Sequence, residues 1–160
     1  FQTHLTFPEQ KRVFSLIPGL ENAEFVRYGV MHRNTYLHSP GILNRYYQVI
    51  DQPRLSFAGQ MTGVEGYVES TASGLVAAVE LAHRLLGLAP VDFPRETALG
   101  ALACYVSDPT VANFQPMNVN FGIIPPLGYK VKGKRNKNAE LSRRALAALD
   151  ETKARFAEEV

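Results

Sequence analysis

The residues from 55 to 70 are the part of this 160-residue chain that most constrains how it can fold. They begin with a short apolar run, 55–58, of the kind that forms a buried strand. A turn is then predicted by three closely spaced glycines, Gly59, Gly63 and Gly66. From position 64 to about position 87, apolar residues recur at three- and four-residue steps, which predicts a helix. The stretch therefore predicts a strand, a glycine turn and a helix in that order.

A turn of this kind leaves free backbone N–H groups at the start of the following helix, together with the positive end of the helix dipole. Such a place suits a phosphate group or an electron-rich ring. Glycine also adopts positive φ angles and lets a flat ligand approach the backbone closely. The glycine spacing differs, however, from the GxGxxG dinucleotide fingerprint. From these residues alone, a nucleotide or cofactor site and a simple packing turn both remain open.

Composition places the chain among ordinary folded proteins, with 46% hydrophobic and 20% charged residues. No apolar run reaches the ~20 residues that a membrane span needs, and no metal site is expected. The single cysteine, Cys104, cannot form an internal disulfide and fits a reducing compartment, so we expect a cytoplasmic location. Cys104 has no neighbouring histidine or positive cluster in the sequence to favour its thiolate, which indicates a small core residue rather than a nucleophile.

Positive charge is concentrated late in the sequence, although the whole chain has a net charge of only +2. Between positions 130 and 144 one acid, Glu140, is surrounded by basic residues: Lys130, Lys132, Lys134, Arg135, Lys137, Arg143 and Arg144. Such a patch could contact a phosphate backbone, which makes RNA a candidate partner. A solvated linker followed by an exposed helix face explains the same residues.

The rest of the chain carries signals for further helices and short strands. Helices are expected at residues 6–16, 95–107 and 138–158. The first of them would start with a capping box formed by Thr6 and Glu9. Strands are expected at 25–31 and 46–50, which are rich in β-forming residues. Residues 113–128 lack periodicity and predict an ordered, extended loop.

Four segments resemble a known family in the same order along the chain. They are GLENAEFVRYGVMHRNTY at 19–36, GQMTGVEGYVESTASGL at 59–75, ETALGAL at 96–102 and NFQPMNVNFG at 113–122. The family is that of the folate- and FAD-dependent tRNA uridine methyltransferases, within the wider group of glucose-inhibited-division-like flavoproteins. The resemblance covers nearly the whole chain.

The resemblance implies an α/β fold. It implies that residues 26–128 are the C-terminal half of an FAD-binding Rossmann-like domain. Residues 1–25 would be the end of an inserted α/β domain, and residues 129–160 a basic linker with a C-terminal helix. The family's dinucleotide fingerprint and catalytic cysteines should precede this sequence, so the chain is expected to be a C-terminal fragment that is inactive alone.

The activity that the resemblance implies is methylation of C5 of the T-loop uridine, position 54, of tRNA. Methylenetetrahydrofolate would be the carbon donor, reduced FAD the hydride donor, and NADH or NADPH the reductant. The implied partners are tRNA and the missing N-terminal half of the same protein, with no membrane. No catalytic residue is expected within this chain.

The resemblance also assigns candidate binding residues. Those for the flavin are Gly59, Gln60, Gly63, Val64, Glu65, Gly66 and Tyr67. The histidine of the RYGVMHRNTY motif, His32, would stack on the pterin ring of the folate, with Arg33 and Asn34 near the same cleft. Without the resemblance, His32 would be taken for a structural or surface histidine, and Tyr67 could equally be a core aromatic.

Two alternatives remain. A sister flavoprotein that modifies the wobble uridine of tRNA has a similar Gly-Gln-x-x-Gly-x-x-Gly-Tyr turn, but Val64-Glu65 and the string at 27–36 favour the methyltransferase. The other alternative is a flavin-independent RNA-binding module that uses the basic residues between 130 and 144. It predicts RNA binding with a steep salt dependence.

Overall fold

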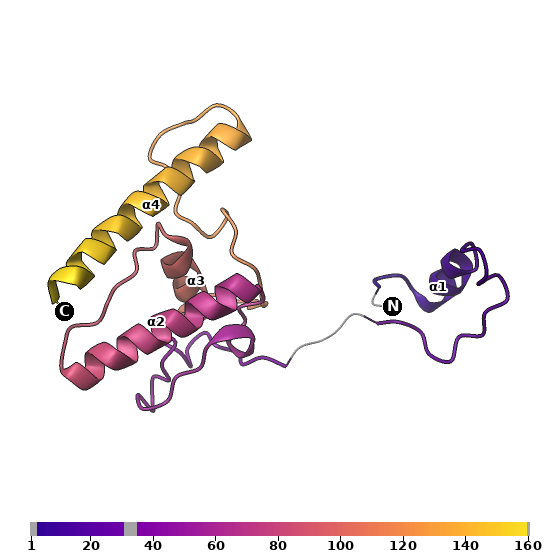
Figure 1. Cartoon of the computed structure of the whole chain (residues 1–160), viewed down its shortest axis with the longest axis horizontal. Helices are drawn as coiled ribbons and strands as arrows, with labels where there is room; N and C mark the ends of the chain where they lie inside the picture. The colour runs from indigo at the N-terminus through magenta and orange to yellow at the C-terminus, as the bar shows by residue number, and fades with distance from the viewer. Residues whose placement is uncertain (1–2, 31–34, 160) are drawn as a thin grey trace. The chain divides into compact units, whose positions relative to one another are not determined.

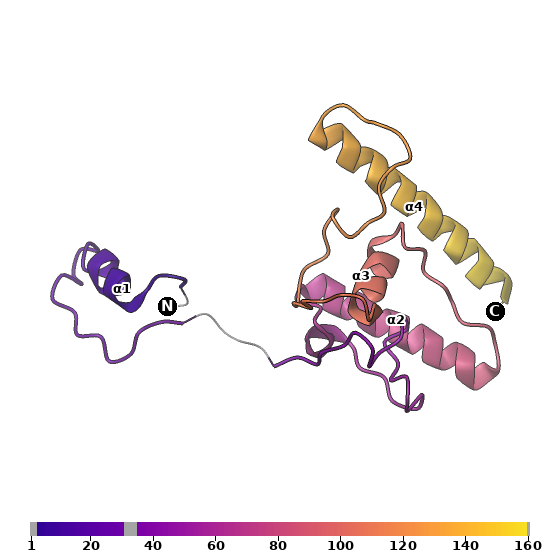
Figure 2. The ribbon, with the colours of Figure 1, turned by 180° about the vertical axis from the view of Figure 1, so that it is seen from behind.

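The computed structural model describes residues 3–30 and 35–159, with side chains through residue 157. The chain divides into two units, the first within Phe1–Asn34 and the second within Thr35–Val160. Figures 1 and 2 show the helices of each unit from opposite sides.

The first unit is built on helix α1 (Phe7–Phe14), which confirms the first expected helix. Thr6 is its N-cap residue and a proline lies in the first turn, where its missing N–H costs nothing. The expected capping box is wrong, because the Thr6 side chain makes no capping hydrogen bond. Glu9 instead pairs with Arg12 one turn later, with 2.6 Å between the carboxylate and the guanidinium.

A buried glutamine connects α1 to the segment that follows it. The Gln10 amide donates to the carbonyl oxygen of Gly29 and accepts from its N–H, each at 2.8 Å. Phe25 and Tyr28 stack with their ring centroids 5.4 Å apart. The strand expected here is absent from residues 25–30, because the backbone of Gly29 bonds to a side chain rather than to a second strand.

The second unit contains the 3-10 helix η1 (Gly59–Thr62) and the helices α2 (Tyr67–Leu86), α3 (Ala98–Ser107) and α4 (Lys134–Glu159). All three predicted helices are confirmed with shifted starts. α2 ends at Leu86, and the residue that caps it, Gly87, has a φ of +69° that favours glycine. α3 starts after Thr97, whose hydroxyl accepts from the Gly100 N–H at 3.0 Å. α4 starts at Lys134, before position 138, where the last helix was expected to begin. As predicted, no helix forms within residues 113–128, all of which are described.

The strands expected at 46–50 and 55–58 are reduced to isolated antiparallel bridges. The Phe57 N–H donates to the Tyr47 carbonyl at 2.9 Å. Tyr47 itself has a φ of +62°, a left-handed conformation that interrupts a regular ladder. Residues 3–30 and 35–159 therefore contain helices, loops and single bridges, with no extended strand.

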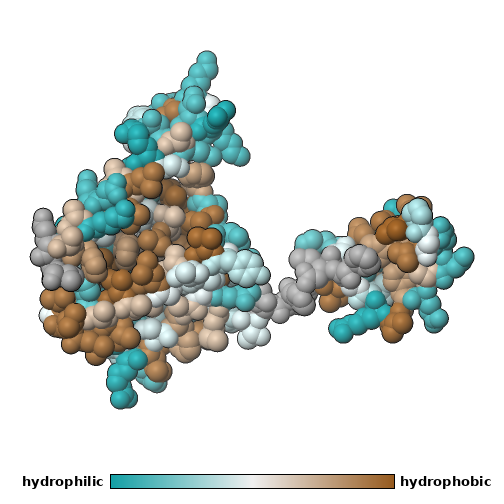
Figure 3. Space-filling view, in the orientation of Figure 1, coloured by the Kyte–Doolittle hydropathy of each residue, from teal (hydrophilic) through white to brown (hydrophobic). Residues whose placement is uncertain are grey.

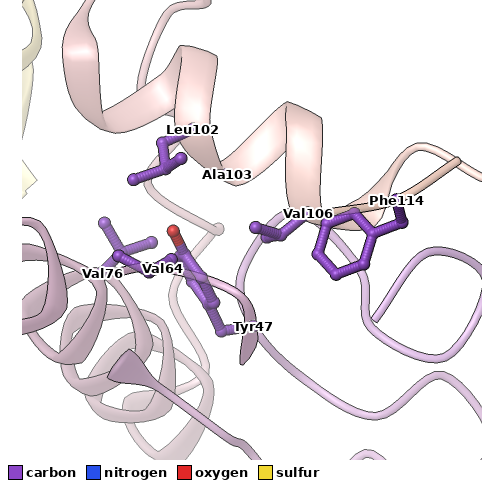
Figure 4. Close-up of a cluster of buried hydrophobic side chains, with 7 residues drawn as sticks. All are labelled: Tyr47, Val64, Val76, Leu102, Ala103, Val106 and Phe114. Atoms are coloured by element: carbon purple, nitrogen blue, oxygen red, sulfur yellow. The ribbon is translucent and has the colours of Figure 1, made fainter. Parts of the chain in front are cut away.

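The core of the second unit lies where α2 and α3 meet the loops on either side (Figure 4). Its buried side chains are Tyr47, Val64, Val76, Leu102, Ala103, Val106 and Phe114. In both ribbon views α3 lies between α2 and α4 (Figures 1 and 2). A second cluster of Ala101, Ile124 and Leu141 attaches α4 to α3. Cys104, on α3, is half-buried beside the first cluster. None of the helices in the described ranges has both the length and the apolar character to cross a membrane.

Candidate functional site

The glycine turn before α2 is held by side-chain hydroxyls of the helix that follows it. The Gly59 N–H donates to the Ser73 hydroxyl at 2.7 Å, and that hydroxyl donates to the Ser70 carbonyl at 2.7 Å. The Thr62 hydroxyl donates to the Gly59 carbonyl at 2.8 Å. Small hydroxyl residues in α2 thus fix the start of the turn.

Gly63 is the most constrained position of the turn. Its φ is +91°, and a Cβ on it would overlap the ring of Phe114. The next residue forms a parallel bridge with Met117: the Met117 N–H donates to the Gly63 carbonyl at 3.0 Å, and the Glu65 N–H donates to the Met117 carbonyl at 3.2 Å. The motif at 113–122 is therefore hydrogen-bonded directly to the glycine turn.

The first turn of α2 presents backbone donors to solvent. Gly66 is the N-cap residue and has no side chain to cap the helix. The N–H groups of Tyr67 and Val68 lack acceptors within the helix, and none of the other described residues accepts from them. Tyr67 is 95% exposed, so its interpretation as a core aromatic is excluded. This set of donors fits an electron-rich ring or an anionic group.

Glu69 is a site residue that the sequence reasoning missed. A Cβ on Gly66 would collide with the Glu69 carboxylate, which lies over the N-cap position. The same carboxylate accepts from the Val119 N–H at 3.3 Å and so joins α2 to the loop after Met117. The signal was present in the sequence, since Glu69 lies near the start of the predicted helix, where the positive end of the helix dipole favours an acid.

The predicted flavin residues fall into two groups by exposure. Gly63, Val64 and Gly66 are buried and form the support of the turn, while Gly59 is half-buried. The exposed residues are Gln60, Glu65 and Tyr67. The structure thus brings all seven residues into one turn, with polar and aromatic side chains on its outer surface.

A hollow of about 280 Å³ lies beside this turn. Its lining is apolar apart from a few polar groups and comprises Tyr47, Val68, Glu69, Ala72, Ser73, Ala98, Leu99, Leu102 and Val119. Ligand pockets share this character of an apolar wall with few polar groups. Burial raises the pKa of Tyr47 far above its usual range, and nearby Cys104 adds to the shift, so the phenol stays neutral.

The predicted folate residues His32, Arg33 and Asn34 lie outside the described residues. The segment that follows them is tied to the glycine turn. The Leu37 N–H donates to the Met61 carbonyl at 2.8 Å, and the buried Ser39 hydroxyl donates to the Thr62 carbonyl at 2.9 Å.

The basic residues predicted for RNA also divide in two. Arg143 pairs with Glu140, and Arg144 donates to the carbonyls of Pro125 and Pro126. The other five, Lys130, Lys132, Lys134, Arg135 and Lys137, are exposed. Within the described ranges, no group of three or more histidine, cysteine or acidic side chains is arranged to hold a metal ion.

Comparison with known proteins shows the family to which this chain belongs. The sequence model of the family described as glucose inhibited division protein A matches residues 1–89. The chain belongs to this family. A solved structure of GidA from Aquifex aeolicus aligns with 99% of this chain and 26% of its own, with a TM-score of 0.51 and 21% sequence identity, which supports a common fold.

The most similar curated relatives found here have one function in their names. Each is a methylenetetrahydrofolate–tRNA-(uracil-5-)-methyltransferase, TrmFO. The protein of Lactiplantibacillus plantarum is 60% identical over 93% of this chain, and that of Acetivibrio thermocellus 57% over 98%. The protein of Staphylococcus aureus strain Newman is 56% identical over 96%. The chain spans only about a third of the length of these relatives, 34%, 36% and 35% respectively.

Proposed function

We propose that this chain is the C-terminal part of a folate- and FAD-dependent tRNA uracil-C5 methyltransferase. The observation that carries the proposal is 56–60% identity to TrmFO proteins over 93–98% of the chain. We further propose the division expected from the sequence: an inserted domain ending near residue 25, the closing half of a Rossmann-like FAD domain at 26–128, and a linker with α4 at 129–160. We propose the cytoplasm as the site of action.

The glycine turn is the proposed contact for the flavin. When bound, FAD would supply the hydride for the transferred carbon. The N–H groups of Tyr67 and Val68 would stabilise negative charge on the ring, aided by the helix dipole. Gly63 has a left-handed backbone, with a φ of +91°, that a residue with a Cβ rarely adopts, and the exposed ring of Tyr67 would form a wall of the pocket.

His32 is the proposed folate contact, with Arg33 and Asn34 beside it. The support is their position in the sequence, directly before the segment in which Leu37 bonds to Met61 of the glycine turn. The target uridine must leave the stacked T-loop to be reached. NADH or NADPH would be the reductant of the flavin. We assign no catalytic residue to this chain, so the activity requires the remainder of the protein.

The experiment is an assay of the full-length parent protein, loaded with FAD, on unmodified tRNA with methylenetetrahydrofolate labelled at its methylene carbon. Label at C5 of uridine 54 supports the proposal. A flavin-loaded protein that leaves this base unlabelled and modifies the wobble uridine would assign the chain to the sister flavoproteins. A protein that binds tRNA but no flavin would support the flavin-independent RNA-binding alternative and overturn the proposal.

A further inference from the structure

A loop before α4 is fixed to that helix by three side chains one turn apart. The Asn136 amide donates to the Lys132 carbonyl at 3.1 Å. Glu140 accepts from the Tyr129 hydroxyl at 3.1 Å. Arg144 donates to the Pro126 carbonyl at 3.0 Å. Positions i, i+4 and i+8 share one helix face, so the loop lies along α4 and is held at each successive turn.

Five cations around this loop take no part in holding it. They are Lys130, Lys132, Lys134, Arg135 and Lys137, called the basic cluster below. All five are exposed, and within the described residues none of their side chains has an ion-pair or hydrogen-bond partner. The one acid nearby is already engaged, because Arg143 and Tyr129 bind Glu140 and together lower the pKa of its carboxyl. The positive charge of the cluster is therefore not neutralised locally.

The stability of α4 does not explain why the residues of the basic cluster are positively charged. The first turn of α4 contains no acid, and Lys134, Arg135 and Lys137 stand where the positive end of the dipole disfavours cations. Each such placement weakens a helix at low salt. Arg143 and Arg144, in contrast, have structural partners. The cost is understandable if the cluster binds an anionic partner.

Three residues of the cluster line a hollow of about 520 Å³. Lys130, Lys132 and Lys137 line it together with Tyr129, whose side chain is half exposed. Hydrophilic side chains gather over this end of α4 at the top of the space-filling view (Figure 3). An array of lysines beside an aromatic ring is a surface that suits a phosphate backbone and an unstacked base.

We propose that the basic cluster binds the phosphate backbone of the tRNA substrate, and that Arg143 and Arg144 only hold the loop in place. This inference rests on the proposed function, because that function supplies the RNA. Each phosphate contact should contribute about 0.7–0.9 to the slope of log affinity against log salt. At 0.15 M salt, the loss of one such contact should therefore weaken the affinity for tRNA about fivefold.

The test uses the full-length, FAD-loaded parent protein and unmodified tRNA. Dissociation constants are measured from about 0.05 to 0.3 M KCl. The variant K130Q/K132Q/K137Q removes three charges from the hollow and should weaken binding about a hundredfold at 0.15 M salt, with a slope smaller by 2 to 3. It should raise KM for tRNA and leave the flavin content and kcat at saturating tRNA near wild type. Arginine at the same three positions should restore binding.

The matched control is K11Q/K153Q/R155Q, which removes the same charge from exposed positions outside the cluster. It should change the affinity little. Two results would overturn the proposal that the basic cluster binds tRNA. One is a cluster variant with wild-type affinity and a wild-type slope of log affinity against log salt. The other is a control variant that loses as much tRNA affinity as the cluster variant. A wild-type protein that binds tRNA with normal salt dependence but transfers no label would instead overturn the proposed activity, so the two failures are distinguishable.

Discussion

Replacing Gly63 by alanine should destabilise the second unit, because two independent costs coincide at this position. The φ of +91° is unfavourable for a residue with a Cβ, by roughly 1–2 kcal/mol. The new methyl group would overlap the ring of the buried Phe114, and overpacking of this kind costs roughly 1–3 kcal/mol. The sum, about 2–5 kcal/mol, is a large part of the ~5–15 kcal/mol that stabilises a typical protein.

Urea unfolding measures this change. Far-UV circular dichroism would follow the helices and tyrosine fluorescence the core, since the chain has seven tyrosines and no tryptophan. Gly74→Ala is the matched control, because Gly74 lies inside α2 and a Cβ there would meet nothing within 4 Å. That substitution should stabilise the protein by about 0.5–1 kcal/mol. The two alanine substitutions should therefore shift the midpoint in opposite directions.

The same substitution in a Phe114→Leu protein separates the cost of the backbone conformation from the cost of the overlap with Phe114. In Phe114→Leu the smaller side chain leaves space, so Gly63→Ala should lose only the backbone cost of about 1–2 kcal/mol. In the full-length protein, Gly63→Ala should also lower the FAD content. A Gly63→Ala protein with a wild-type midpoint and wild-type flavin content would refute this account of the turn.

Three further predictions concern other parts of the chain. Tyr47 keeps its proton in the folded state while an unfolded tyrosine loses it near pH 10, so stability should fall above about pH 10 by up to ~1.4 kcal/mol per pH unit. Urea midpoints against pH should show a shallower decline for Tyr47→Phe. Gln10→Ala removes the side chain that bonds both backbone groups of Gly29, so the Gly29 amide should exchange about tenfold faster or more, corresponding to roughly 1–3 kcal/mol. His32→Ala in the full-length enzyme should raise KM for methylenetetrahydrofolate about threefold to tenfold with FAD retained; an unchanged KM would exclude His32 from the folate site.

Helices were predictable from the sequence because their signal is local. The three- and four-residue apolar steps identified α2, and Gly87 marked its end. The start was displaced from position 64 to Tyr67 because Val64 bridges to Met117, a partner more than fifty residues away. Periodicity carries no information about such a partner.

Strands were predicted less well for the same reason. A run of β-forming residues favours an extended backbone, but a β-ladder forms only when a second segment pairs with it in register. At Tyr47 the left-handed backbone breaks the run, and at Gly29 a glutamine side chain takes the place of a neighbouring strand. Nothing in the sequence indicated that Asn136, Glu140 and Arg144 hold the loop before α4, because the groups they bind, backbone carbonyls and the Tyr129 hydroxyl, belong to a loop without periodicity.

The supporting side of the glycine turn and its proposed binding side are separate, and this separation gives a way to test the role of the turn. The hydroxyls of Ser70, Ser73 and Thr62 bond to the backbone on the inner side, where Phe114 packs against Gly63. The outer side consists of the free N–H groups of the first turn of α2 and exposed side chains such as Tyr67.

Substitutions on the two sides should therefore have different effects. Tyr67 is almost fully exposed, so its replacement by alanine removes little packing and should leave the urea midpoint within about 0.5 kcal/mol of wild type. If Tyr67 forms a wall of the flavin pocket, the same variant of the full-length protein should bind FAD more weakly. Gly63→Ala should instead reduce stability and FAD binding together. Equal flavin affinity in the Tyr67 variant and in wild type would mean that the pocket is formed by the backbone donors of α2 without the tyrosine ring.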